Sequence, residues 1–186
     1  MTYSSVEDIY RAIDEVRARL VARVESLDEE AQNFRPDEAA WTVAEIVEHL
    51  SVLEHKLSQL MTMMVGKVES VAAAGGTGAG AGAHFKPFTL DEHAARARGE
   101  KYVAPEEVRP RGGVALSDSL ARLRESRAAL VSLRPRIERA DFGAATYPHP
   151  AFGPLNLYQW LAFIGLHEQR HLNQIERLLE KLAAEA

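Results

Sequence analysis

Four separate stretches of the sequence repeat apolar residues with a period of about 3.6, and this pattern constrains the fold more than any other feature. They cover about residues 5–30, 42–65, 117–138 and 156 almost to the end of the chain. No stretch alternates convincingly with a period of two, as a half-buried strand would. Four helices that each have one apolar face bury those faces best in a four-helix bundle. The sequence therefore predicts an all-α fold.

Helix-capping signals support these boundaries. Thr42 is followed three residues later by Glu45, which together form a capping box before the second helix. Ser5 and Asp8 form a similar pair at the start of the first helix, and Asn156 is a good N-cap for the fourth. We therefore expect the four helices to begin close to these residues.

A long connection, residues 66–113, separates the second and third helices. It contains the glycine-rich run 72–82, and glycine at that density cannot hold a helix, so we expect a mobile loop there. Residues 85–88 are expected either to pack over one end of the bundle as a lid or to be disordered. A connection this long can run the length of a bundle, which would leave the second and third helices parallel. The 186 residues suit a single domain, 1–186.

Composition excludes several classes of function. The formal net charge of -5 leaves no surplus of cations to neutralise a phosphate backbone, so nucleic acid is a poor candidate partner. The chain has 0 Cys, so it can form no disulfide, thiolate metal site or cysteine nucleophile, and any thiol must come from a second molecule. Neither a signal peptide nor a membrane-spanning run is recognisable, and we expect a cytoplasmic protein.

Three of the seven histidines fall where they could form one site. His167 and His171 are four residues apart, so on a helix their imidazoles project from the same side. Helical geometry places His171 about 40° and His167 about 80° from the centre of the fourth helix's apolar stripe. His49 lies about 80° from the centre of the second helix's stripe, whereas His55 lies about 160° away and should be solvated. The pattern predicts that His49, His167 and His171 bind a divalent transition metal.

Three protein ligands would leave a fourth coordination position open, which is typical of a catalytic metal site. Water or a thiol bound there becomes more acidic and acts as a nucleophile at neutral pH. Each histidine taken alone could instead be a core-edge residue that forms a hydrogen bond with a carbonyl or a carboxylate. The same metal could also clamp the second and fourth helices in a binding or stress protein that catalyses nothing.

Residues 167–171 also match the H-E-x-x-H pattern of zinc proteases, in which Glu168 would be the general base. The glycine and histidine that a metzincin needs three and six positions after the second histidine are absent, so a zincin-type metalloprotease is the less favoured function. Glu168 points within about 20° of the apolar centre, a costly place for a carboxylate. It is either a catalytic residue or a hydrogen-bond partner of a histidine or of an arginine such as Arg122 or Arg127.

Other residues near the candidate site have milder interpretations. Arg170 points about 140° from the apolar centre, so we expect it to face solvent or a partner subunit. Trp41 and Trp160 are expected in the core at the ends of the bundle. His149 is expected in a surface loop before the fourth helix.

Several segments together resemble a known family. Residues 41–50, WTVAEIVEHL, resemble the tryptophan-to-histidine segment that opens the second helix of DinB/YfiT-like proteins. Residues 149–155, HPAFGPL, the pair Gln159-Trp160 and residues 167–175 resemble the lead-in and last helix of that family. The matching segments cover under a third of the chain and occur in the family's order.

The resemblance implies a bundle connected up-down-down-up and a metal site formed by His49, His167 and His171, usually loaded with zinc or nickel. It also implies a metal-dependent transferase or isomerase that uses bacillithiol, mycothiol or glutathione, and a homodimer. The expected partners are thus a small thiol and an electrophile, with no nucleic acid and no membrane. The metal would deprotonate the external thiol, which then attacks an electrophilic carbon.

Overall fold

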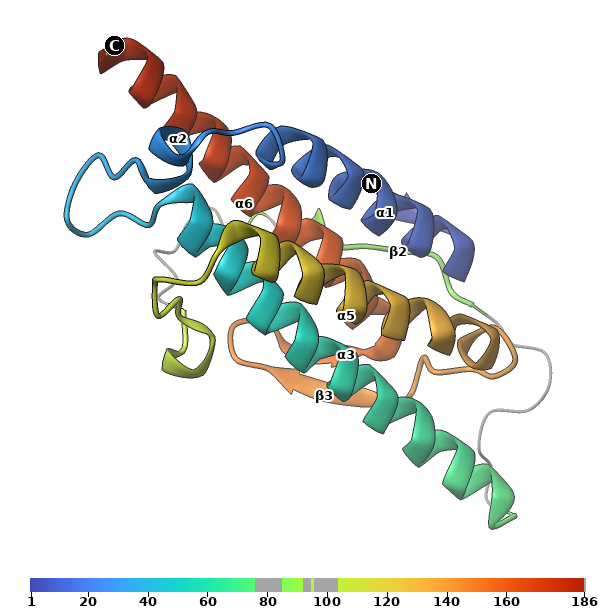
Figure 1. Ribbon diagram of the computed structural model, residues 1–186. Coiled ribbons are helices and arrows are strands. Elements are labelled where there is room, and N and C mark those ends of the chain that lie inside the picture. The colour runs from blue at the N-terminus through green and yellow to red at the C-terminus, as the bar shows by residue number, and fades with distance from the viewer. Residues whose placement is uncertain (76–84, 92–94, 96–103, 186) are drawn as a thin grey trace.

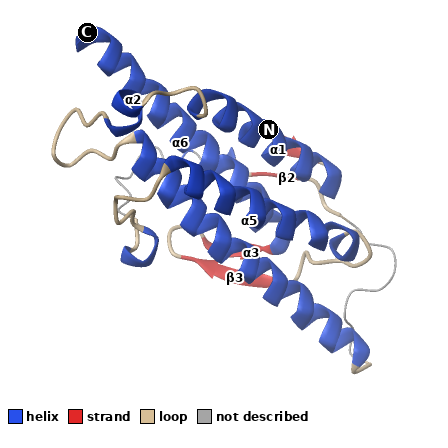
Figure 2. Cartoon of the chain, in the orientation of Figure 1, coloured by secondary structure: helices blue, strands red, loops and turns tan. Residues whose placement is uncertain are grey.

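The computed structural model describes residues 1–75, 85–91, 95 and 104–185, and most of them are helical (Figures 1 and 2). The long helices are α1 (Val6–Val24), α3 (Val43–Ala73), α5 (Leu116–Ile137) and α6 (Leu157–Glu185). The short helical elements are α2 (Glu29–Asn33) and the 3₁₀ turn η1 (Glu106–Val108). The strands are β1 (Thr2–Tyr3), β2 (Phe88–Thr89), β3 (Thr146–His149) and β4 (Gly153–Asn156). The predicted four-helix bundle is confirmed.

The helices connect up-down-down-up. On α3 and α5, Glu54 contacts Arg127 and Glu69 contacts Arg136, so residue numbers increase in the same direction and the two helices are parallel. Figure 1 shows α1 and α6 running together in the opposite sense. The connection between α3 and α5 therefore returns along the bundle, as its length predicts.

Two predicted helix boundaries are wrong. The first helix ends at Val24 rather than near residue 30, because the Asp28 side chain accepts a hydrogen bond from the Ala31 N–H and starts α2 as a separate helix. The second helix does not end at Val65 but continues through Gly66 to Ala73. One glycine costs a helix only about 1 kcal/mol, which packing of its neighbours on the core can offset.

The long connection contains structure as well as loop. β2 pairs antiparallel with β1. Phe85 packs against the core, with its ring centroid 4.8 Å from that of Tyr158. A second antiparallel pair, β3 and β4, leads into α6. These strands have two to four residues, too few for an alternating pattern to be recognisable. Most of the glycine-rich run, residues 76–82, lies outside the described residues.

A layer of charged side chains divides the core into two apolar clusters. The cluster nearer the strands includes Ile13, Leu57, Leu130 and Ile164. The other includes Leu20, Leu50, Leu123 and Leu172. Between the two clusters, each long helix contributes one charged residue, and these form what we call the charged layer: Arg17, Glu54, Arg127 and Glu168.

The helices α3 and α6 are the longest, with 31 and 29 residues. Charged residues recur along both of them. In the part of the chain that the structure describes, no helix carries an apolar run that could cross a membrane.

The close contact between α1 and α6 depends on Gly165. A Cβ atom added there would lie 3.0 Å from Cγ2 of Ile13 and 3.5 Å from its Cα. We therefore expect Gly165→Val to lower the free energy of unfolding by roughly 1–3 kcal/mol, because the two helices must move apart. Urea denaturation measures this change. Gly66→Val is the control, since nothing lies within 4 Å of the corresponding position; an equal loss in both variants would contradict the explanation.

Candidate metal centre

The three predicted histidines converge between α3 and α6. His49 lies in the second turn of α3, and His167 and His171 lie one turn apart on α6. Their ring centroids are 5.2 Å apart for His49 and His167, 4.9 Å for His49 and His171, and 4.5 Å for His167 and His171. One nitrogen from each ring lies within 4.8 Å of the others. The residues described contain a three-histidine cluster that could hold a metal ion.

Hydrogen bonds orient two of the rings. Nδ1 of His49 lies 2.6 Å from the carbonyl oxygen of Val108, which can only accept, so Nδ1 carries the proton. Nδ1 of His171 lies 2.9 Å from Oε1 of Gln174 and donates in the same way. In both neutral rings the lone pair is therefore on Nε2, which is the usual arrangement for a metal-binding histidine.

The spacing of the nitrogens suits a tetrahedral ion. Nε2 of His49 and Nε2 of His167 are 3.5 Å apart. Two nitrogens that each bind zinc at about 2.0–2.1 Å with tetrahedral angles are separated by about 3.4 Å. The histidines thus fit a divalent transition metal, and imidazole ligands accommodate zinc and nickel alike.

Burial keeps these histidines neutral. His49 and His171 are only 2% and 1% exposed, whereas His167 is half-buried. Burial is the main cause that lowers the pKa of His49, places the pKa of His167 well below its ordinary value and lowers the pKa of His171 to about 3. The positive charge of Arg170 lowers all three values further. Neutral imidazoles are the form that binds metal, so no proton has to be displaced at neutral pH.

A turn after η1 holds the Val108 carbonyl against His49. The carboxylate of Glu48, which is 4% exposed, accepts hydrogen bonds from the backbone N–H groups of Arg111 at 3.0 Å and Gly112 at 3.1 Å. Gly112 has a φ of 76°, a conformation that glycine adopts without strain. Glu48 thus anchors the turn, and the next residue, His49, contacts the Val108 carbonyl just before it. The end of the long connection therefore contributes to the site.

Aromatic side chains border the histidines on two sides. Trp41 lies 5.1 Å from His49 and stacks on His171 at 6.4 Å between ring centroids, so it lines the site as well as packing on the core. Phe163 lies 5.5 Å from His167. His149, expected in a surface loop, lies on β3 and contacts Phe163 at 4.7 Å. Trp160 is buried in the core as expected.

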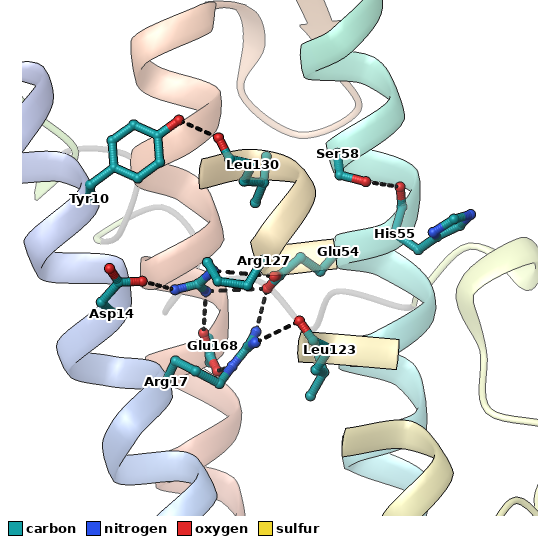
Figure 3. A network of polar contacts seen from close by, with 10 residues as sticks. All are labelled: Tyr10, Asp14, Arg17, Glu54, His55, Ser58, Leu123, Arg127, Leu130 and Glu168. Atoms are coloured by element: carbon teal, nitrogen blue, oxygen red, sulfur yellow. Dashed lines mark hydrogen bonds and ion pairs between the residues drawn. The ribbon is translucent and has the colours of Figure 1, made fainter. Parts of the chain in front are cut away.

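Glu168 points into the charged layer, toward Arg17 and Arg127 (Figure 3). Its Oε1 accepts a hydrogen bond from Nε of Arg17 at 2.5 Å, and its Oε2 accepts one from Nη2 of Arg127 at 3.4 Å. Arg17 also donates to Glu54, and Arg127 donates to Glu54 and Asp14. Burial raises the pKa of Glu168, and the charge of Arg17 opposes this rise. The arginine pairing anticipated for Glu168 is therefore present, while its catalytic role stays a prediction.

Sequence reasoning missed several of these partners. Gln174 lies three residues after His171, so helical spacing could have identified it. Arg17 could have been found as a gap in the apolar stripe of the first helix, between Ile13 and Leu20. The Val108 carbonyl had no signal, because any residue could supply a backbone oxygen.

The hydrogen bond from His171 to Gln174 makes a testable contribution to metal binding. We expect Gln174→Ala to weaken metal affinity by about 10- to 100-fold, because the ring loses the acceptor that fixes its tautomer and orientation. Competition with a chromophoric chelator measures this. Asn173→Ala is a neighbouring control, since Asn173 is exposed and bonds only Gln169 among the described residues. Equal affinity in the wild type and Gln174→Ala would show that the contact does not orient a ligand.

Comparisons with solved structures agree with the fold. TT2238, a four-helix bundle protein, superposes with a TM-score of 0.61 at 20% identity, covering 93% of this chain and 99% of that one. YfiT from Bacillus subtilis, described as a probable metal-dependent hydrolase with an unusual four-helix bundle topology, superposes with a TM-score of 0.58 at 17% identity, covering 97% and 92%. At these identities the similarity establishes the fold alone.

Comparisons of sequence identify the family. The chain is 25% identical over 175 residues to YuaE of Bacillus subtilis strain 168, a protein described as uncharacterised, and the match covers 91% of this chain and 96% of YuaE. The DinB superfamily model matches residues 12–175, a range that includes α3, the part of α6 up to residue 175 and all three histidines. The chain therefore belongs to the DinB superfamily.

Proposed function

We propose that this protein is a metal-dependent enzyme that transfers a low-molecular-weight thiol to an electrophile. The observation that carries the proposal is the convergence of three neutral imidazoles, from His49, His167 and His171, around one point. Three protein ligands leave a coordination position for a substrate, which is typical of catalytic rather than structural metal sites. We propose zinc or nickel as the metal.

The groups around the histidines favour a thiol over water as the nucleophile. A hydrolase needs a base that takes a proton from water as it attacks, and zincins use a glutamate for this. Glu48 and Glu168 directly neighbour two of the histidine ligands in the sequence, but both carboxylates already have other partners. Glu48 accepts hydrogen bonds from backbone N–H groups, and Glu168 accepts them from arginines. The description of YfiT as a probable hydrolase therefore does not extend easily to this chain.

The chain's own residues would support the transfer by holding the ligands and limiting water. Val108 and Gln174 fix the two most buried rings, and Trp41 and Phe163 border the site with apolar surface. A divalent metal held by the three histidines would supply Lewis acidity and lower the pKa of a coordinating thiol, whose proton would pass to solvent. The thiolate sulfur would form a bond to an electrophilic carbon of the second substrate, and the bond from that carbon to its leaving group would break, with the electron pair staying on the leaving group.

Titration of the cobalt-substituted protein with a thiol tests this proposal. We expect addition of 3-mercaptopropionate to produce a sulfur-to-cobalt charge-transfer band and to change the visible spectrum of the ion. The same titration on His49→Ala should show neither change. A cobalt spectrum that no thiol perturbs, in wild-type protein that binds one equivalent of metal, would contradict the proposal.

A metal that only clamps α3 to α6 is the second candidate function, because the ligands come from two different helices. In that case the metal stabilises the fold but no thiol binds it. At a metal concentration about 100 times the Kd, linkage contributes about 2.7 kcal/mol, so chelation should lower the Tm by roughly 5–10 °C. Calorimetry with and without chelator measures this shift. A lower Tm after chelation, together with a cobalt spectrum that thiols do not change, would favour a purely structural metal.

A further inference from the structure

Arg170 directs its guanidinium group at the metal centre. Helical geometry predicted that it faces solvent or a partner subunit, and the residue is exposed. Its side chain nevertheless folds back along α6, and Nη2 lies 3.2 Å from Nε2 of His171, the atom that the Gln174 contact leaves free to bind metal. The guanidinium therefore occupies the immediate surroundings of the ion's position.

Arg170 also lacks an acidic partner among the residues that the structure describes. Some arginines of the bundle are paired, as Arg17 is with Glu168, whereas others such as Arg122 and Arg177 form no ion pair in the described part of the chain. No carboxylate in residues 1–75, 85–91, 95 or 104–185 forms an ion pair with Arg170. A guanidinium beside the site that no carboxylate neutralises is available to bind an anion supplied from outside.

The charge of the loaded site strengthens this argument. Three neutral histidines do not offset the two positive charges of the ion, and Arg170 adds a third beside them. Like charges this close repel each other, and an anion bound near both would offset that repulsion. The lone pair of His171 Nε2 cannot accept a hydrogen bond from Arg170 and bind a metal at once, so metal binding frees the guanidinium for another acceptor.

We propose that Arg170 binds the carboxylate of a thiol substrate whose carboxylate lies a few bonds from its sulfur. This inference rests on the proposed thiol transfer and makes Arg170 the residue that selects among thiols. The sulfur occupies the open metal position, and the planar guanidinium pairs with the two carboxylate oxygens, a geometry that arginine suits better than lysine. A thiol without an anionic group near the sulfur binds the same metal but gains nothing from Arg170.

Two thiols of similar size test the inference on the cobalt-loaded protein. The Kd values of 3-mercaptopropionate, which has a carboxylate, and of 2-mercaptoethanol, which has none, are measured from the charge-transfer band. The ratio of the two Kd values cancels differences in metal loading between variants. We expect Arg170→Gln to reduce the preference for 3-mercaptopropionate about 10- to 100-fold, as loss of a charge-assisted paired contact does. Arg170→Lys should retain part of the preference.

Arg177→Gln is the matched control, because it removes the same charge from α6 about two turns away. We expect it to change the ratio by less than about threefold, since solvent and salt screen a charge at that distance from the ligand. Arg170→Gln should also bind cobalt itself about three- to tenfold more tightly, because it removes a competing donor and a repelling charge. This second readout needs no thiol.

The outcomes separate this inference from the proposed function. If both thiols perturb the cobalt spectrum and Arg170→Gln keeps the wild-type ratio, the role of Arg170 is overturned while thiol binding stands. If neither thiol perturbs the wild-type spectrum, the proposed function itself fails and the role of Arg170 falls with it. Circular dichroism of each variant establishes that the bundle is folded before the ratios are compared.

Discussion

His49→Ala should reduce metal affinity by about 100- to 1,000-fold. Binding of a structural zinc ion by four ligands is worth about 10–16 kcal/mol, so one ligand contributes roughly 3–4 kcal/mol. His49 is the only ligand of the cluster that comes from α3, and its loss leaves a pair on one helix. Competition with a chelator of known affinity measures the change, and metal analysis of the purified variant gives an independent value.

The control is His55→Ala on the same helix. His55 is exposed, as predicted, and bonds Gln59 among the described residues, so its loss should leave metal affinity within about twofold of wild type. Because His49 is buried and its truncation leaves a cavity, circular dichroism checks that His49→Ala is folded before affinities are compared. If His49→Ala binds metal as tightly as the wild type, His49 is not a metal ligand, and the case for metal-dependent chemistry at this site fails.

Glu168→Ala should lower the free energy of unfolding by about 3–5 kcal/mol. Glu168 is 2% exposed and accepts hydrogen bonds from two arginines, so its removal leaves Arg17 and Arg127 sharing the single buried carboxylate of Glu54. Removing one partner of a buried ion pair leaves an uncompensated buried charge, so the loss of stability exceeds the net contribution of the intact pair. Urea denaturation at neutral pH measures the loss.

The pair Arg23–Glu176 provides a matched control for Glu168→Ala. It also joins α1 to α6, at 3.0 Å, but both side chains are partly exposed. Glu176→Ala should therefore cost less than about 1 kcal/mol, as exposed ion pairs do. Comparable losses in the two variants would show that burial of the charged layer is not what makes Glu168 important.

Glu168→Gln separates the structural role of Glu168 from the predicted catalytic one. The amide keeps the size of the side chain and loses its charge, so stability falls because the buried arginines lose their anionic partner. If Glu168 acts only through the charged layer, the folded variant retains wild-type metal affinity and thiol binding. Loss of turnover in protein that still binds metal and thiol would support a direct catalytic role.

The helices were predictable because their signals are local. The capping box of Thr42 and Glu45 and the cap formed by Asn156 and Gln159 are present as predicted, since each needs residues only three positions apart. The end of α3 was not predictable from Gly66, because packing along the bundle rather than local preference carries the helix to Ala73. The pairing of β1 with β2 joins residues more than eighty positions apart, which no local pattern records.

The candidate site divides in the same way. Sequence by itself determined that His167 and His171 share one face of a helix and that His49 and Glu168 point inward, because helical periodicity fixes the direction of a side chain. Only the tertiary structure decided that His49 meets the other two, that Val108 offers its carbonyl and that Glu168 pairs with Arg17. The same structure placed the guanidinium of Arg170, an exposed residue as predicted, 3.2 Å from Nε2 of His171. The physical reason is that periodicity sets an angle about one helix axis, whereas contacts depend on how different helices pack and where a long connection returns.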